Sequence, residues 1–517
     1  MFESSKLKAQ SSKLFAFFAG ITIICGATAA ALETVLPLVL PIVFLVAYLC
    51  IVDYAIVFYL LMACLPLSME YEFPNGLATD LPTEPIMFGL MLIYLVIRSN
   101  QKSNTDVLFW RHPITLLILL AFFWECITAI HAEIVIRAVK QCAAKFWYIC
   151  TFYFLASHLV RSERALRKIF WCLFSTMLFG AIVTLIRHGL KGFAFKEVNY
   201  VMQPFFRNHV MYASIIVVIF PLVWLALGWY QKKSLTRFLL YVGGFILLLG
   251  VQFAYTRGAY IALVGALGFY FVIKYRLTAW VLGLSVLSSI IFFKGLIDDN
   301  HFMAYAPRYE RAVTHYKFEN LVAATAKGED VSTMERVYRW VAGFRMVAEK
   351  PFLGFGAGNF YTSYRPYTVT RFKTYVSKNE EQSTVHCYFL LLGIEQGIPA
   401  VLIFTALLFV AFIRGERIYH STDDKMIKRI TMTMLLIQII ILQLILINDL
   451  IETDKIGGLF YLSLAVIAIL DVHYFQTSQS SNIEIVIYPD IDELELPTDS
   501  VFNEFETSPP SAHEFKK

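Results

Sequence analysis

Two arginines and one histidine lie close to the ends of long apolar runs, and a third arginine lies in a long segment without such a run. Arg257 lies in QFAYTRGAYIALVGALGFYF, Arg207 in QPFFRNHVMYA and His386 in STVHCYFLLLGIEQGIPAVLIF. Arg336 lies one helical turn before Trp340 in MERVYRWVAGFRMVAEKP. A guanidinium gives permanently charged, bidentate donors for phosphate oxygens, and an imidazole can carry a proton near neutral pH. On position alone, interfacial anchoring or capping is the favoured interpretation of Arg257, Arg207 and His386, and a functional role is the alternative.

Several neighbours of these residues have polar or conformational roles that the sequence suggests. Asn208 and His209 follow Arg207 directly and can act as helix caps or hydrogen-bond donors. Glu395 lies nine residues after the histidine, just before a glycine. Gly258 is expected to permit the tight turn at Arg257.

Other kinds of site are not expected from this sequence. It has no HExxH, no P-loop, no dinucleotide-binding fingerprint and no CxxC pair. The adjacent Asp298 and Asp299 are weak metal ligands by themselves. Glu125 is a single acid inside an apolar run, which is thin evidence for a proton-relay transporter. We therefore expect no metal and no cofactor.

The elements that position these residues are membrane helices. Of the 517 residues, 58% are hydrophobic and only 16% are charged, which excludes an ordinary soluble enzyme. Runs of about 20 apolar residues predict transmembrane helices. The sequence predicts an all-α integral membrane protein with 12–14 such helices, at residues 14–32, 35–51, 53–68, 84–98, 113–131, 142–160, 167–188, 209–229, 237–255, 258–274, 278–296, 386–413, 428–449 and 458–475.

The basic loops predict the orientation. Six groups of Lys and Arg fall on one side of the fourteen-span arrangement, which is the cytoplasmic side by the positive-inside rule. These groups lie near residues 6–13, 98–111, 161–168, 232–237, 274–276 and 414–429. Both termini are then cytoplasmic, the first apolar run is retained rather than cleaved as a signal peptide, and His386 faces the periplasm.

Four regions follow from this arrangement. An N-terminal bundle spans 1–296, a large and mostly helical periplasmic loop spans 297–385, and the last helices lie in 386–475. The loop is long enough to be functional, and its portion 312–330 could help to cover a site as a lid. The acidic tail 476–517 is expected to be a largely disordered cytoplasmic segment, with a docking strand at 483–488 as the alternative.

Four segments together resemble the O-antigen ligase and O-antigen polymerase superfamily of bacterial membrane glycosyltransferases. They are PFFRNHVMYA, AYTRGAYIALV, RVYRWVAGFRMVAEKPFLGFGAGNF and VHCYFLLLGIEQG, in the expected order over about residues 200–415. Three positions depart from the usual pattern: Thr256 replaces Ser, Phe352 replaces Leu and Cys387 replaces Asn. The cysteine departs next to His386 and could alter how an acceptor is positioned.

The resemblance implies a reaction. The enzyme would transfer a glycan from undecaprenyl pyrophosphate to an acceptor hydroxyl, most simply lipid A–core of lipopolysaccharide, with inversion and without metal. His386 would be the general base, and the donor pyrophosphate would bind Arg257, Arg207 and Arg336. The supporting residues would be Asn208, His209 and Glu395. The implied location is the bacterial inner membrane, multi-pass, with a lipid-linked glycan donor, a glycolipid or glycan acceptor and membrane lipid as partners, and no nucleic acid.

Alternatives stay open at this point. A polysaccharide polymerase and a protein O-oligosaccharyltransferase share the motifs of the donor half. A transporter or flippase is the non-enzymatic alternative. It accounts for many spans and for Glu125, but it leaves the long loop before His386 unexplained.

Overall fold

The computed structural model describes most of the chain in eight segments. These segments are residues 17–28, 39–72, 78–100, 105–297, 331–370, 373, 377–378 and 383–479. Contacts group residues 1–473 into one compact unit and 474–517 into a second. The predicted lid portion 312–330, the Asp298–Asp299 pair and the tail with its alternative strand at 483–488 lie outside the described residues.

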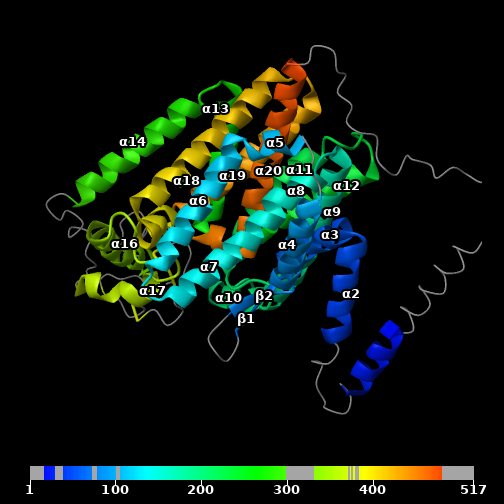
Figure 1. The fold of residues 1–517 in the computed structure, drawn as a ribbon, viewed down its shortest axis with the longest axis horizontal. Coiled ribbons are helices and arrows are strands. Elements are labelled where there is room, and N and C mark those ends of the chain that lie inside the picture. Colours follow the sequence, from blue (N-terminus) through cyan, green and yellow to red (C-terminus); the bar gives the residue numbers. More distant parts are fainter. Residues whose placement is uncertain are drawn as a thin grey trace, which may run out of the picture. The chain divides into compact units, whose positions relative to one another are not determined.

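The first half of the chain is helical apart from one short hairpin (Figure 1). Its helices are Phe17–Thr28, α2 (Val39–Val52), α3 (Tyr54–Cys64), η2 (Leu65–Leu67), α4 (Thr83–Asn100), α5 (Thr105–Trp110), α6 (Pro113–Ile130), α7 (Val135–Tyr148), the π-helix η3 (Ile149–Leu155), α8 (Ala156–Leu159), α9 (Glu163–Leu190), η4 (Phe195–Glu197), α10 (Val198–Met202) and α11 (His209–Ala226).

The hairpin pairs β1 (Met69–Glu72) with β2 (Ala78–Leu81) in antiparallel register. Glu70 lies directly opposite Asp80 in this register. Like charges in such a pair repel each other, so both carboxylates depend on partners outside the hairpin. The sequence had suggested only a long polar segment here.

The second half contains the longest helices. They are α12 (Leu235–Phe253), α13 (Arg257–Lys274), α14 (Thr278–Ile297), α16 (Val331–Glu349), α17 (Phe360–Ser363), η7 (Arg365–Tyr367), α18 (Tyr388–Ser421), α19 (Lys425–Ile445), η9 (Leu450–Glu452) and α20 (Asp454–Gln479). The helical spacing in the long loop correctly predicted α16. α18 combines two helices across a kink at Gly397, whose φ is +79°.

The prediction of an all-α membrane protein is confirmed. Nine helices within the described segments are long and apolar enough to cross a membrane, and three shorter apolar helices precede them. Each of the fourteen predicted spans contains a helix. The predicted span 142–160 belongs to a continuous helical stretch formed by α7, η3 and α8.

Burial separates central helices from lipid-facing ones. The apolar window of α11 is 78% buried, and those of α19 and α20 are both 72% buried. The window of α14 is only 11% buried, and this helix packs on α18 and α13 at the edge of the bundle (Figure 1). A helix that leaves apolar side chains exposed to this extent needs lipid around it.

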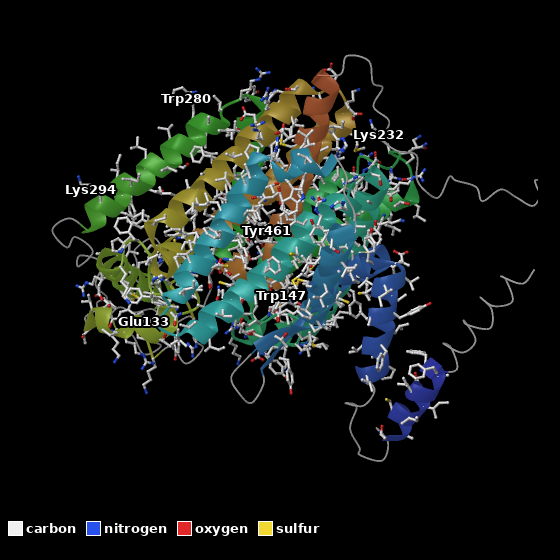
Figure 2. All side chains as sticks on the ribbon, viewed as in Figure 1. Glu133, Trp147, Lys232, Trp280, Lys294 and Tyr461 are labelled. Atoms are coloured by element: carbon white, nitrogen blue, oxygen red, sulfur yellow. The ribbon has the colours of Figure 1, made fainter. Side chains whose placement is uncertain are left out.

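Chain reversals bring six helix ends together at one end of the bundle. They are the first residues of α11, α13, α18 and α20 and the last residues of α12 and α19. Glu133, between α6 and α7, lies at this end, and Lys232, between α11 and α12, lies at the opposite end (Figure 2). All the predicted site residues lie in or near the first of these two ends.

Candidate functional site at one end of the bundle

His386 stands just before α18 in an unusual backbone conformation. Its φ is +55°, in the left-handed region that residues other than glycine rarely adopt. Its backbone N–H donates to the Thr384 hydroxyl at 3.4 Å, and the flanking Val385 and Cys387 are buried. The buried neighbours hold the strained residue in place, which is typical of functional positions.

α16 brings two arginines to this histidine. Arg339 donates to the backbone carbonyl of Thr384 at 3.1 Å and pairs with Glu335 at 3.5 Å. Both of these side chains are buried, and the Ser377 hydroxyl also donates to Glu335. Arg336 acts electrostatically on His386 from the same helix.

Burial and the positive charges of Arg339 and Arg336 lower the pKa of His386 from 6.5 to about 3. The free protein therefore keeps this imidazole neutral at any ordinary pH. A neutral imidazole has one nitrogen lone pair that can accept a proton. Sequence inspection had identified Arg336 but had missed Arg339.

Asp449 completes the charged group and was also missed. Burial raises the pKa of its carboxyl, while a side-chain hydrogen bond with Thr384 and the charge of Arg207 oppose that rise. The sequence prediction placed Asp449 at the end of span 428–449, so it was not considered as a site residue. α19 in fact ends at Ile445, and Asp449 lies in the turn that follows.

Arg207 lies just before α11 and reaches two acids. It is 3.7 Å from Glu70 of the hairpin, and it interacts with Asp449. Asn208 caps α11 by accepting from the Met211 N–H at 2.9 Å. The ring and backbone N–H of His209 both contact the side-chain oxygen of Asn199, at 2.7 and 3.1 Å. Asn208 and His209 thus hold the backbone that presents Arg207.

Arg257 is the first residue of α13 and is tied to the same neighbourhood. The Thr256 hydroxyl donates to the His209 carbonyl at 3.3 Å. The prediction that Gly258 permits the turn is wrong, because Tyr255 is the residue with positive φ, at +52°. Gly258 instead allows close packing, since a Cβ there would lie 2.7 Å from Cδ1 of Ile447, two residues before Asp449.

Two buried networks fix the turn that carries Asp449. In the first, Glu452 accepts from Gln141 at 3.0 Å and from Lys145 at 3.2 Å. Lys145 also pairs with the buried Glu125 at 2.7 Å. Glu125 was considered as a proton-relay group, and its partner is this lysine in α7. A paired, buried carboxylate explains the acid without transport.

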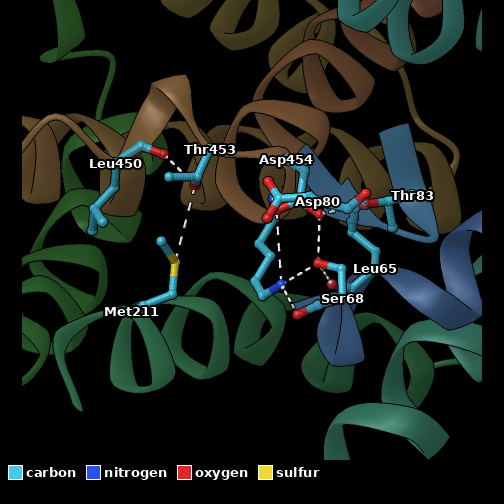
Figure 3. A network of polar contacts seen from close by, with 9 residues as sticks. Leu65, Ser68, Asp80, Thr83, Met211, Leu450, Thr453 and Asp454 are labelled. Carbon is cyan, nitrogen blue, oxygen red and sulfur yellow. Dashed lines mark hydrogen bonds and ion pairs between the residues drawn. The ribbon is translucent and has the colours of Figure 1, made fainter. Parts of the chain in front are cut away.

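The second network is shown in Figure 3. Asp454 accepts from the hydroxyls of Ser68 at 2.6 Å and Thr83 at 2.8 Å. The neighbouring Lys455 donates to the Ser68 carbonyl at 2.8 Å. Thr453 also contacts the sulfur of Met211 at 4.0 Å (Figure 3). The turn from Ile445 to Asp454 is therefore connected to α7, α11 and the loop before β1.

Glu395 binds the glycine-rich loop at residues 350–360 and not the charged residues around His386. Its carboxylate accepts from the Phe360 N–H at 3.1 Å, and the Gly358 N–H also bonds to it. The Gly356 N–H donates to the Glu395 carbonyl at 2.8 Å. A Cβ on Gly397 would lie 2.1 Å from the Phe352 carbonyl. The glycines of this loop allow it to pack against the kink of α18.

The structure thus brings together Arg207, Arg336 and His386, with Arg257 joined to them through its neighbours. It adds Arg339 and Asp449. No three His, Cys, Asp or Glu side chains in the described segments are grouped so that they could hold a metal ion. The arrangement offers a neutral base and several permanent cations near one carboxylate, which suits an anionic substrate that must lose or transfer a proton.

Residues 242–405 match the family model described as O-antigen ligase. This match supports membership of the O-antigen ligase superfamily over about a third of the chain. No curated protein matches it. The matched range contains Arg257, Arg336 and His386, whereas Arg207 and Asp449 lie outside it. The match supports a membrane glycosyltransferase of the O-antigen ligase or polymerase type.

Proposed function

We propose that this protein transfers a glycan from undecaprenyl pyrophosphate to an acceptor hydroxyl, with lipid A–core as the leading acceptor. The observation that carries the proposal is the position of His386 beside Arg336 and Arg339, with Asp449 hydrogen-bonded to the nearby Thr384. The proposed location is the bacterial inner membrane, with the site facing the periplasm. The basic loops at the opposite end, around Lys232, then face the cytoplasm.

The arginines act on the donor. When the bond between the anomeric carbon and the phosphate oxygen breaks, negative charge grows on the pyrophosphate. Arg207, Arg257 and Arg336 are permanently charged. Arg257 and Arg336 lie in helices and Arg207 directly before one, so they stabilise this charge with little reorganisation. Such residues supply the electrostatic stabilisation without requiring a metal.

The donor also activates the base. The pyrophosphate brings negative charge to Arg336, and this offsets the positive field that holds the pKa of His386 near 3 in the free protein. The pKa then rises toward its usual range, where an imidazole is an efficient general base. His386 accepts the acceptor hydroxyl proton as the oxygen attacks the anomeric carbon. Direct displacement inverts that carbon.

Asp449 has a positioning role in this scheme. Its carboxylate joins Thr384, two residues before the base, to Arg207 on the donor side. The same carboxylate therefore bonds next to the base and attracts one donor arginine electrostatically. The two networks around Glu452 and Asp454 fix the position of the turn that carries this carboxylate.

The test is a deletion strain of the native host complemented with wild type or His386→Ala. Surface glycolipids are separated by gel, and the lipid-linked pool is extracted. Finished polymer that accumulates on undecaprenyl pyrophosphate and is missing from lipid A would support the ligase. A single repeat left on lipid A would indicate a polymerase instead. Changed glycoproteins with unchanged glycolipids would indicate a protein O-oligosaccharyltransferase. Full complementation by His386→Ala would reject the assignment of His386 as the general base.

A further inference from the structure

A second group of cations lies at the end of the bundle opposite the candidate site. α11 ends there at Ala226, α12 begins there at Leu235 and α19 begins there at Lys425. Lys232, in the loop between α11 and α12, marks this end in Figure 2. Arg237 near the start of α12 and Arg429 near the start of α19 are the two residues of interest.

Arg429 is held against the end of α11. Its guanidinium carbon lies 4.5 Å from the centre of the Trp224 ring, and its Nε donates to the Trp224 carbonyl at 3.1 Å. A Cβ on Gly228 would lie 2.7 Å from a terminal nitrogen of this guanidinium and 2.9 Å from its central carbon. The absence of a side chain at Gly228 therefore leaves space for the guanidinium of Arg429, which has a fixed position against the end of α11.

Arg237 approaches the same place from α12. It donates to the Tyr230 carbonyl at 3.1 Å and to the Tyr241 hydroxyl at 3.3 Å. Arg237 and Arg429 are close enough to repel each other electrostatically. Two guanidiniums from distant parts of the sequence thus bind carbonyls that are six residues apart, those of Trp224 and Tyr230.

The charge of this pair is not offset by a carboxylate. The polar contacts of Arg237 and Arg429 within the described segments are two backbone carbonyls and one tyrosine hydroxyl. The sequence has no Asp or Glu from residue 198 to residue 297. Other arginines at this end do have acidic partners: Arg167 pairs with Glu163, and Arg414 with Asp471 at 3.1 Å.

We propose that Arg237 and Arg429 together bind the phosphate headgroup of an anionic phospholipid. A phosphate between two guanidiniums would remove their repulsion and form charge-assisted hydrogen bonds to both. Basic sites between helices at the cytoplasmic side are a known means of holding such lipids.

The surroundings favour a lipid over a free phosphate ion. Trp224 and Tyr241 place aromatic rings beside the guanidiniums, as at the headgroup level of a bilayer. Phe238 and Phe245 on α12 are exposed by 62% and 61%. These apolar side chains offer an acyl chain a surface that continues from the cationic seat toward the centre of the membrane.

The experiment uses the purified full-length protein in neutral detergent. Thermal stability and retained lipid, by native mass spectrometry, are measured after addition of phosphatidylglycerol, phosphatidylcholine or inorganic phosphate. The variant Arg237→Gln/Arg429→Gln removes both charges and keeps side-chain amides that can donate to the Tyr230 and Trp224 carbonyls. Lys274→Ala removes an exposed charge at the same end and is the matched control.

Wild type and Lys274→Ala should retain phosphatidylglycerol at least about tenfold more tightly than phosphatidylcholine, because hydrogen bonds to charged groups are the strong ones. The double glutamine variant should lose this preference. Equal retention of the two lipids by wild type, or full retention of phosphatidylglycerol by the variant, would reject the proposal. Equal stabilisation by inorganic phosphate would reject a lipid in favour of a small-anion site. If the double variant does not fold, the single variants Arg237→Gln and Arg429→Gln provide the test. Each should retain phosphatidylglycerol about tenfold less tightly than wild type.

Discussion

Two histidines at opposite ends of the bundle, His386 half-buried and His112 buried, have opposite surroundings. His386 lies beside Arg336 and Arg339, in a left-handed backbone conformation, and its pKa is lowered to about 3. His112 caps the start of α6, where its Nδ1 accepts from the Ile114 N–H at 3.3 Å and its Nε2 contacts Asp471 at 3.0 Å. Asp471 also binds Arg414 at 3.1 Å.

The comparison separates a structural histidine from one available for chemistry. Both ring nitrogens of His112 are used by protein atoms, and a carboxylate balances the nearby charge. His386 instead lies beside the positive charges of Arg339 and Arg336, which lower its pKa. The residue type is the same in the two places, so the two sites differ in the sign of the neighbouring charges and in burial, which is greater for His112.

The largest expected effect comes from replacing each of the two histidines with alanine. His386→Ala should lower transfer by about 10²–10⁴-fold, the usual contribution of a general base, with unchanged expression and melting temperature. His112→Ala should leave the rate per folded molecule unchanged and cost about 1–3 kcal/mol of stability, because a buried acceptor and a cap are lost. Rate measurements on purified protein and thermal unfolding check both. Equal rate losses in the two variants would contradict the distinction.

Asp449→Asn should have the next largest effect. The amide keeps the shape of the carboxylate but loses the charge that partners Arg207, so we expect kcat to fall by about 10–100-fold, or roughly 1.4–2.7 kcal/mol. Asp471→Asn, at the other end, is the matched control and should mainly lower the melting temperature. Steady-state kinetics with a lipid-linked donor distinguish them. An unchanged kcat in Asp449→Asn would remove this residue from the mechanism.

Arg336→Gln should change the pH dependence of kcat/KM. The positive charge of Arg336 lowers the pKa of His386, so its removal raises that pKa from about 3 toward the usual 6.5. As the pH falls, the imidazole of the variant is then protonated earlier than that of the wild type. The acid limb of the pH profile of kcat/KM, which reports the free enzyme, should therefore move upward by about one pH unit. Arg345→Gln, on the same helix but bound to the Tyr367 carbonyl, should leave the limb in place. A limb that does not move would show that Arg336 does not act on the base.

The smallest effect is expected at the hairpin. Glu70→Gln removes the carboxylate that lies 3.7 Å from Arg207, so the donor no longer competes with it. Since the pair is solvent-exposed, the KM for the donor should fall by only about two- to fivefold, with kcat unchanged. The gain should disappear at high salt, which screens the same interaction. A rise in KM would mean that Glu70 helps to place the donor.

The sequence predicted the parts of this molecule that depend on local pattern. Apolar runs gave the helices, helical spacing gave α16, and residue chemistry pointed to Arg336 and His386. Asp449 was missed because hydropathy averages over a window and extended the predicted span past the real end of α19 at Ile445. The role proposed for Gly258 was wrong for a related reason, since the atom it must avoid belongs to Ile447, far away in sequence.

Contacts between distant residues explain what remained out of reach. Lys145 and Glu452 are separated by 307 positions, and Ser68 and Asp454 by 386. Nothing in one sequence links such pairs, although they fix the turn that carries Asp449. The hairpin was also not anticipated, because its two strands are only four residues each and alternate weakly.

The positive field around His386 has a consequence for how each turnover would end under the proposed mechanism. After transfer, His386 holds the acceptor's proton, and the lipid pyrophosphate still balances the arginines. When that product leaves, the field returns and the pKa of the imidazole drops back toward 3, so the proton is expelled to water. Departure of the spent carrier and resetting of the base are then a single event. A bound carrier that cannot leave would keep the site protonated, so the pyrophosphate product should be a strong inhibitor of the next round.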